Sequence, residues 1–189
     1  DKKTGNFTST DLSSQITSLN SAVFDLGDID NDQDIDLIVS GFSSSGGYKS
    51  YVYKNTTTLG GAFTLTVTTD NLIAVKDGSA DLIDFDSDGD LDAVISGTSS
   101  TGDVFEIYMN QTKQGKPGWP KLSNLGLLPA RNSKVDLGDF NGDGYSDLLY
   151  SGTIEGLGET TKLSEFNPVT KKYVDSKFDV SDVINAEVE

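Results

Sequence analysis

Asp84-Phe85-Asp86-Ser87-Asp88-Gly89-Asp90-Leu91-Asp92 places five carboxylates on alternate positions within nine residues. Like charges so close together repel one another. A hard divalent cation bound by oxygen removes that repulsion, and Ca²⁺ takes about six to eight oxygen ligands in a flexible geometry. The stretch therefore predicts a Ca²⁺ loop. Its expected ligands are the side chains of Asp84, Asp86, Asp88 and Asp92 and the backbone carbonyl of Asp90, with Gly89 at the sharp turn.

The same pattern occurs three times in the chain. Loop one is residues 28–36, loop two is residues 84–92 and loop three is residues 139–147, so successive loops start 56 and 55 residues apart. A solvated acidic turn, the alternative interpretation, would not return at a fixed interval. The predicted ligands are Asp28, Asp30, Asp32, Asp34 and Asp36 in loop one, Asp84, Asp86, Asp88, Asp90 and Asp92 in loop two, and Asp139, Asn141, Asp143, Tyr145 and Asp147 in loop three. We therefore expect about three Ca²⁺ ions, one in each loop.

The three loops are not equal. Loop one has Gln33 at position six, where glycine would turn most easily, so its backbone is expected to be strained or to take a different dihedral angle. Loop three has the neutral Asn141 at position three, and fewer charges favour weaker binding. We expect loop two to be the best site.

An EF-hand is excluded by the residues that follow each loop. That motif needs a bidentate glutamate at position twelve. Position twelve is Val39, Ile95 or Tyr150 in the three copies. Each loop is followed by a short apolar run instead of the amphipathic helix that follows an EF-hand loop.

The composition excludes several other classes of protein. The 189 residues contain neither Cys nor His, which excludes disulfides, Cys/His zinc sites and a catalytic triad that uses His. The net charge of −16 argues against nucleic acid and anionic membranes as partners. No apolar run approaches the length of a membrane span. The chain starts at Asp1 and shows no signal peptide, so we expect a mature or excised segment.

Other features recur with the loops and predict short strands. Each loop is preceded by Asp-Leu and followed by an apolar run and Ser-Gly, as in Ala93-Val94-Ile95-Ser96-Gly97. Further on come an aromatic or Met residue and Asn, at Tyr53-Lys54-Asn55, Tyr108-Met109-Asn110 and Phe166-Asn167, and then an aromatic residue. Phe63 to Thr68 alternates with period two, as a strand does. Each unit of about 55 residues is therefore predicted to form four antiparallel strands.

The expected organisation is all-β, with about three propeller blades and flanking strands of an incomplete or larger propeller. Three blades are too few to close a ring, because propellers typically have about four to eight. The predicted divisions are residues 1–20 (a fourth strand of a preceding blade, around Phe7, with a connector), 21–76, 77–132 and 133–180 (three repeats) and 181–189 (the start of a next blade). Further blades of the same protein, or another copy, would complete the ring.

The three units resemble FG-GAP repeats of the integrin α-subunit type and, more closely, their bacterial VCBS-type relatives. The resemblance lies in loops one to three and the apolar run behind each, although Gln33 replaces the usual glycine and the Phe-Gly and Gly-Ala-Pro elements are not clear. It implies β-propeller blades that bind Ca²⁺ between their first two strands. It also implies binding to protein or glycan.

Three functions follow as hypotheses. The first is a non-enzymatic, Ca²⁺-stabilised module of a secreted or cell-surface protein, expected to be bacterial, that serves adhesion or displays a ligand site for protein or glycan. The second is part of a polysaccharide lyase or glycoside-degrading enzyme, in which paired carboxylates would be acid and base. The third is a structural spacer. No catalytic residue is predicted, because the aspartates are assigned to metal.

Two further sets of residues leave alternatives open. The recurring aromatic residues could pack on outer strands, the favoured interpretation, or stack on sugars; they are Phe7, Phe63, Trp119 and Tyr173. The aspartates ahead of the loops could be strand residues or bond to a neighbouring loop, again favoured, or extend the metal site; they are Asp25, Asp81 and Asp136.

Overall fold

The computed structural model describes residues 11–68, 71–112, 115–116 and 118–177, and these residues form strands and loops without a helix. The first sheet contains β1 (Asn20–Gly27), β2 (Asp36–Ser43), β3 (Gly47–Asn55) and β4 (Leu65–Val67). The second contains β5 (Val75–Ile83), β6 (Asp92–Ser99) and β7 (Gly102–Tyr108). The third contains β8 (Ala130–Gly138), β9 (Asp147–Ile154), β10 (Gly158–Asn167) and β11 (Lys172–Asp175).

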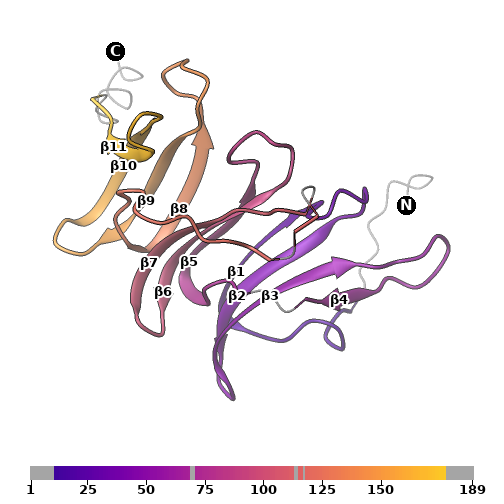
Figure 1. The fold of residues 1–189 in the computed structure, drawn as a ribbon. Helices are drawn as coiled ribbons and strands as arrows, with labels where there is room; N and C mark the ends of the chain where they lie inside the picture. The colour runs from indigo at the N-terminus through magenta and orange to yellow at the C-terminus, as the bar shows by residue number, and fades with distance from the viewer. Residues whose placement is uncertain (1–10, 69–70, 113–114, 117, 178–189) are drawn as a thin grey trace, which may run out of the picture.

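Every sheet is an antiparallel meander in which neighbours in sequence are neighbours in space. The three sheets fan out side by side, with the second between the other two (Figure 1). Their first strands begin at Asn20, Val75 and Ala130, each 55 residues after the last. The predicted all-β class and its propeller-like blades are therefore confirmed. Within the described residues the fan stays open, as expected for an incomplete ring.

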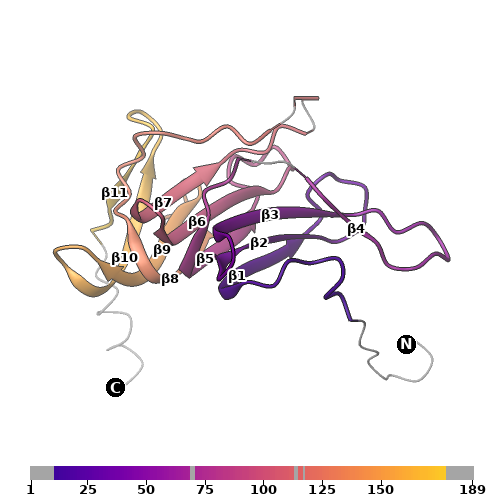
Figure 2. The ribbon, with the colours of Figure 1, turned by 90° about the horizontal axis from the view of Figure 1, so that it is seen from below.

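The second strand of each sheet is the most deeply buried. In β6, Ala93, Val94 and Ile95 are all fully buried, so both faces of the strand are covered. The run after each loop is apolar throughout for this reason, because a strand with two buried faces has no solvent side to alternate with. The innermost strands β1, β5 and β8 lie next to one another across the fan, while β4 and β11 lie at its outside (Figure 2).

Two hydrophobic clusters fill the spaces between the sheets. The first lies between the first and second sheets and includes Ile38, Val52, Leu82 and Ile95. The second lies between the second and third sheets and includes Val94, Ile107, Leu148, Tyr150 and Tyr173. The middle sheet therefore contributes one face to each cluster.

The glycine of the recurring Ser-Gly pair packs closely against the first strand of its own sheet, and the serine bonds to the next sheet. A Cβ on Gly97 would lie 2.8 Å from the Lys76 carbonyl oxygen, so only glycine fits opposite the bulge in β5. The serine beside the glycine bonds to the next sheet. The Ser40 hydroxyl donates to the Val75 carbonyl (2.9 Å) and accepts from the Val75 N–H (2.7 Å). Ser96 and Ser133 share a hydroxyl hydrogen bond of 2.6 Å at the next boundary.

The second sheet corrects the expectation of four strands in every unit. After β7 the chain makes one bridge, from Lys121 to Tyr108, and two backbone hydrogen bonds, Met109 N–H to the Pro120 carbonyl (3.0 Å) and Leu122 N–H to the Ile107 carbonyl (2.8 Å). The segment thus follows the expected path of a fourth strand. Pro120 has no N–H and cannot continue the ladder, so a regular strand does not form.

The alignment of the recurring Asn is also corrected in the third sheet. Leu37 pairs with Tyr53 and Ala93 with Tyr108, whereas the equivalent Leu148 pairs with Ser164. Phe166 therefore takes the place of Asn55 and Asn110, and Asn167 lies one residue beyond it. The extra residue was hidden in the sequence because Phe166 resembles the residue that precedes the Asn.

The ends of the fan differ from its middle. Phe24 and Leu26 of β1 are 65% and 59% exposed, whereas the equivalent Ala80 and Leu82 of β5 are buried against the first sheet. Within the described residues, no sheet covers this side of β1. The expected flanking strands, around Phe7 and at residues 181–189, lie outside the described residues.

Candidate metal-binding loops

Each acidic loop joins the first and second strands of its sheet. Loop one lies between β1 and β2, loop two between β5 and β6, and loop three between β8 and β9. The structure thus places all three at the turns where the sequence analysis expected them. Because the antiparallel strands on either side fix both ends, each loop is presented by rigid elements.

The aspartate at position nine is buried in all three loops and bonds to the backbone on two sides. In loop two the Asp92 carboxylate accepts the N–H of Phe85 (3.0 Å) and the N–H of Asn110 (2.7 Å). The equivalent bonds run from Ile29 and Asn55 to Asp36 (2.9 and 2.8 Å) and from Phe140 and Phe166 to Asp147 (3.1 and 2.9 Å). This residue therefore ties the start of the loop to the end of the third strand, a role that sequence reasoning missed.

Positions four and six of each loop take left-handed backbone conformations. Position six has φ values of 75° at Gln33, 86° at Gly89 and 87° at Gly144. Position four has 61° at Asn31, 60° at Ser87 and 77° at Gly142. The predicted strain at Gln33 is confirmed, because a side chain disfavours this region.

Backbone N–H groups turn the other carboxylates into the loop. The carboxylate at position one accepts the N–H at position six: Gln33 to Asp28 at 2.9 Å, Gly89 to Asp84 at 3.1 Å, and Gly144 to Asp139 at 2.9 Å. The carboxylate at position five accepts the N–H at position seven, at 2.9 Å in all three loops. A carboxylate has about four lone-pair sites, so these bonds leave acceptor capacity for a cation.

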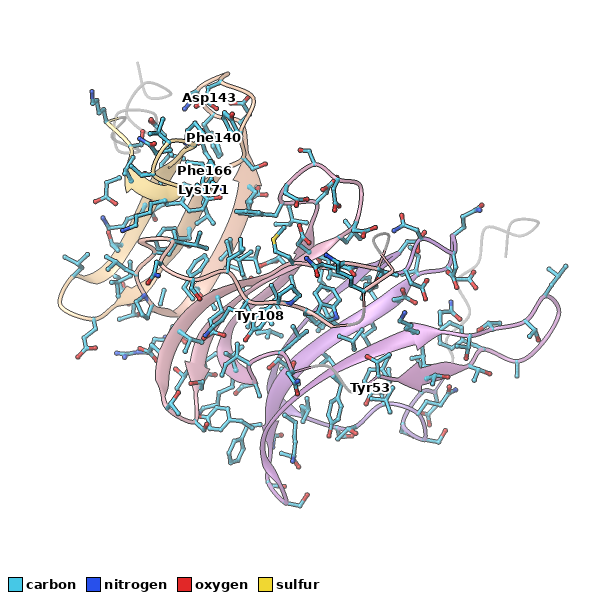
Figure 3. The ribbon with its side chains drawn as sticks, viewed as in Figure 1. Tyr53, Tyr108, Phe140, Asp143, Phe166 and Lys171 are labelled. Atoms are coloured by element: carbon cyan, nitrogen blue, oxygen red, sulfur yellow. The ribbon has the colours of Figure 1, made fainter. Side chains whose placement is uncertain are left out.

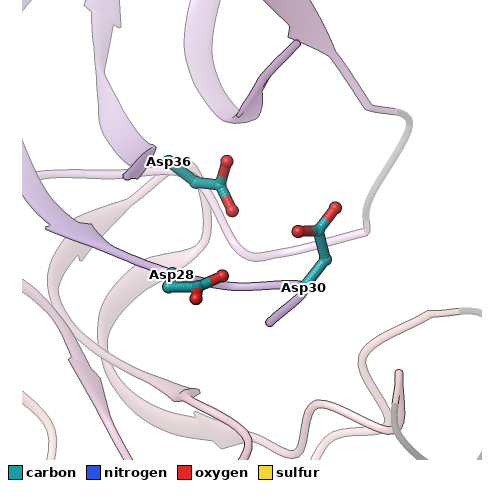
Figure 4. Close-up of side chains that lie close together, drawn as sticks. All are labelled: Asp28, Asp30 and Asp36. Carbon is teal, nitrogen blue, oxygen red and sulfur yellow. The ribbon is translucent and has the colours of Figure 1, made fainter. Parts of the chain in front are cut away.

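Carboxylate oxygens converge in loops one and two. Asp28, Asp30 and Asp36 each contribute an oxygen to a group whose members lie within 4.8 Å of one another (Figure 4). Asp84, Asp86 and Asp88 do the same in loop two. Oxygens bound to one Ca²⁺ lie about 2.3–2.6 Å from it, so they can be separated by about this distance. Asp30 Oδ1 and Asp84 Oδ1 are also buried without a hydrogen-bond partner. The residues present therefore fit a hard cation.

Loop three is more open. Asp139, Asn141 and Asp143 are exposed, and the Asn141 amide donates to Asp143 Oδ2 at 3.1 Å. Phe140 and Asp143 lie near Phe166 at one end of the third sheet (Figure 3). Tyr145 at position seven packs its ring 5.8 Å from that of Phe166.

Burial and the crowding of like charges raise the pKa values of carboxyl groups in loops one and two. Burial, together with the smaller effects of Asp86 and Asp88, raises the pKa of Asp92 to about 6, against the lowering effect of its two N–H donors. Burial and then the neighbouring Asp88 raise the pKa of Asp86 as well. In loop one, burial raises the pKa of Asp36. A bound cation would favour the ionised form of each group.

Three neighbouring side chains contact the loops in ways that sequence reasoning missed. Lys54 on β3 places its Nζ 3.0 Å from Asp30 Oδ2, so loop one has a cation of its own. Asn31 Nδ2 donates to Asp90 Oδ1 in loop two (2.8 Å), and Asn110 Nδ2 donates to the Ile29 carbonyl in loop one (2.8 Å). The recurring Asn was the only signal in the sequence, and it did not reveal that these bonds cross between sheets.

The remaining sequence candidates lie apart from the converging oxygens. Asp25 is a strand residue of β1, as the favoured interpretation allowed, and its Oδ2 accepts the Leu82 N–H of β5 in the second sheet (2.8 Å). Asp81 accepts from the Ser79 hydroxyl (2.5 Å). Among the aromatic residues, Tyr173 is buried in the second cluster and Trp119 packs against the first, as the packing interpretation predicted. Phe63 is 40% exposed, and Phe7 lies outside the described residues.

Three meandering sheets, each with an aspartate-rich loop between its first two strands, define a protein built from propeller-type blades. Residues 84–150 match the FG-GAP-like repeat family. The chain therefore carries an FG-GAP-like repeat that begins at the first aspartate of loop two, which confirms the resemblance drawn from the loops.

A curated relative covers more of the chain. The "T-cell immunomodulatory protein homolog" of Plasmodium falciparum (isolate 3D7) is 32% identical over 103 residues, which is 54% of this chain and 14% of the relative. The chain thus spans about a seventh of the length of the relative it matches. No solved structure matches the chain. The described residues contain no helix long and apolar enough to cross a membrane.

Proposed function

We propose that this chain is a non-enzymatic, calcium-binding FG-GAP module of an extracellular or cell-surface protein, with one Ca²⁺ in each loop. The observation that carries the proposal is the convergence of three carboxylate oxygens in loop one and three in loop two, where Asp30 Oδ1 and Asp84 Oδ1 are buried without a hydrogen-bond partner. Leaving such a group unpaired costs about 1–3 kcal/mol, and more when it is charged. A bound Ca²⁺ would supply the missing partner.

The role proposed for the metal is structural. The converging carboxylates of loop one come from both ends of the turn between two strands, so an ion bound among them would hold those strands in register and cancel the repulsion. A ligand that binds only the folded state stabilises it by about 2.7 kcal/mol at a hundredfold excess over Kd. Extracellular modules bind Ca²⁺ at about 10⁻⁴–10⁻³ M, which supports a location outside the cell.

The module is proposed to present a surface to an extracellular protein or glycan. The FG-GAP-like repeat supports this role, since the family resemblance implies adhesion. Among the residues that the structure describes, the acids outside the loops do not suggest a catalytic pair. Glu106 accepts from the Tyr108 hydroxyl and forms an ion pair with Lys121 (2.9 Å). Screening the chain against glycan and extracellular-protein panels, with turnover measured alongside, tests this part of the proposal.

Thermal unfolding with and without Ca²⁺ tests the metal. Saturating CaCl₂ is expected to raise the melting temperature above that in EGTA by roughly 5–10 °C for each strongly occupied site, because about 1 kcal/mol corresponds to about 2–4 °C in a chain of this size. MgCl₂ at the same concentration is the ionic control. The double variant Asp86→Asn/Asp88→Asn should lose the contribution of loop two. Identical melting curves in CaCl₂ and EGTA would refute the proposal.

A further inference from the structure

Loops one and two are joined by side-chain hydrogen bonds that cross the boundary between the first and second sheets. The amide of Asn31, at position four of loop one, donates to Oδ1 of Asp90 at position seven of loop two (2.8 Å). Asp90 is fully buried, although residues 86–89 just before it are exposed. A charge-assisted hydrogen bond of this kind is among the stronger ones in proteins.

A second amide joins the same two loops through their backbones. Asn110 Nδ2 donates to the Ile29 carbonyl of loop one (2.8 Å) and to the Leu91 carbonyl of loop two (3.2 Å). Its own N–H donates to Asp92 (2.7 Å). The Asn110 side chain is therefore bonded to position two of loop one, while its backbone is bonded to position nine of loop two.

From these contacts we infer that Asn31 and Asn110 are positioning residues that couple cation binding in loops one and two. The inference rests on the proposed function. A cation in loop two would fix residues 90–92, and the two amides would then hold Ile29 and Asn31 in place before loop one binds its own ion. A loop that is already ordered binds its cation more tightly, because less conformational entropy is lost on binding. By thermodynamic linkage, a cation in loop one must strengthen binding in loop two by the same factor.

The boundary between loops two and three lacks the residues for such a link. Ser87 replaces Asn31 at position four, Tyr145 replaces Asp90 at position seven, and Phe166 replaces Asn110 at the end of the third strand. None of these three can make the corresponding amide bond. Loop three is therefore expected to bind independently, and it supplies a control within the same chain.

The matched variants also come from the chain itself. Asn31→Ser installs the residue of loop two, and Asn31→Gly installs that of loop three; both of those residues take the same left-handed conformation as Asn31. If both replacements have the same effect on binding, that effect is due to the lost amide and not to a change in the backbone at position 31. Because the Asn31 side chain is not among the predicted metal ligands, loop one keeps its full set of oxygens in both variants.

The experiment is a CaCl₂ titration of the ¹⁵N-labelled 189-residue chain, in which backbone amide resonances report the occupancy of each loop separately. Disabling loop two with Asp86→Asn/Asp88→Asn is expected to weaken loop one about fivefold, the effect of roughly one hydrogen bond. Disabling loop three with Asp139→Asn/Asp143→Asn should leave loop one within about twofold. In the Asn31→Ser and Asn31→Gly backgrounds, disabling loop two should weaken loop one by less, because only the link through Asn110 remains.

The outcomes separate the two proposals. If loop one binds equally well with loop two intact or disabled, the coupling is refuted and the proposed function stands. If the effect of disabling loop two is undiminished in both Asn31 variants, the assignment to this residue is refuted. If no loop resonance responds to CaCl₂, the proposed function fails and the coupling fails with it.

Discussion

The boundary between the first and second sheets and the boundary between the second and third use different chemistry at matching positions. At the first, Ser40 bonds to both backbone groups of Val75, and amides cross between the loops. At the second, one hydroxyl pair joins Ser96 to Ser133, and aromatic rings fill the space. The ring pairs are Phe105 with Tyr150 at 5.2 Å, Phe85 with Tyr173 at 6.3 Å and Phe166 with Tyr173 at 5.5 Å between centroids.

The difference shows that a repeated blade does not need a repeated interface. Position twelve is Ile95 in the second sheet and Tyr150 in the third, and both side chains are buried at the boundary with the preceding sheet. Polar bonds specify orientation, whereas rings contribute mainly buried area and tolerate small shifts. The first boundary is thus suited to transmit a change in one loop to the next, and the second to hold the sheets together.

The largest expected effect on stability is at the boundary between the second and third sheets, where aromatic rings pack. Tyr150→Ala removes a buried ring that contacts Phe105, and it should lower the free energy of unfolding by about 3–5 kcal/mol. Ile95→Ala at the matching position should cost less, because fewer atoms are removed. Urea unfolding followed by circular dichroism measures both. A smaller loss for Tyr150→Ala than for Ile95→Ala would reverse the comparison.

The next largest effect on stability is expected at the boundary between the first and second sheets, where Ser40 bonds to Val75. Ser40→Ala leaves the N–H of the buried Val75 without its acceptor, which should cost about 1–3 kcal/mol. Ser151→Ala is the matched control, because Ser151 holds the same position in the third sheet, on the face that no described sheet covers. It should change stability by less than about 0.5 kcal/mol. Equal losses in the two variants would show that the serine stabilises its own sheet and not the boundary.

A smaller effect is expected at the turn of loop one. Gln33→Gly relieves a left-handed φ of 75° and should stabilise the fold by about 1 kcal/mol, or roughly 2–4 °C in melting temperature. Gly89→Gln in loop two should destabilise it by a similar amount. Melting in EGTA measures both without a contribution from Ca²⁺. If Gln33→Gly lowers the melting temperature, the Gln33 side chain makes a stabilising contact that outweighs the strain.

Much of this architecture could be predicted from the sequence because its causes are local. The alternation of side chains along a strand depends on a few neighbouring residues. So do the spacing of Asp84 to Asp92 and the apolar run behind them. The 55-residue interval then gives the number of sheets. The strain at Gln33 was predictable for the same reason. Pro120 also acts locally, and its effect on a fourth strand could have been predicted.

What escaped the sequence analysis depends on contacts between sheets. Asn31 lies 59 positions from its partner Asp90, and Asn110 lies 81 from Ile29. Nothing in the spacing of single residues reports which loops face each other. The buried role of Asp92 was missed as well, because an aspartate in an acidic loop satisfies a metal-ligand pattern whether its oxygens face an ion or a backbone N–H.

The smallest expected effect is the pH dependence of stability that is due to Asp81, a residue that senses charges across both boundaries. Burial raises the pKa of Asp81, the Ser79 hydroxyl lowers it, Asp25 across the first boundary raises it, and across the second boundary Lys134 lowers it and Asp136 raises it. The folded state therefore holds this proton to higher pH than the unfolded chain does. Stability is lost as pH rises from the ordinary value of about 3.9 through the raised pKa.

Asp81→Asn removes this loss, so the variant should be more stable than the parent at pH 7, and the advantage should vanish below about pH 4, where the carboxyl is protonated in both states. Melting curves from pH 3 to pH 8 measure it. Asp25→Asn should move the transition to lower pH and Lys134→Met to higher pH, since they remove opposite charges on opposite sides of Asp81. An advantage of equal size at pH 3 and pH 7 would mean that packing, and not the buried charge, distinguishes the variant. Shifts in the same direction from both charge variants would mean that Asp81 does not sense the two boundaries separately.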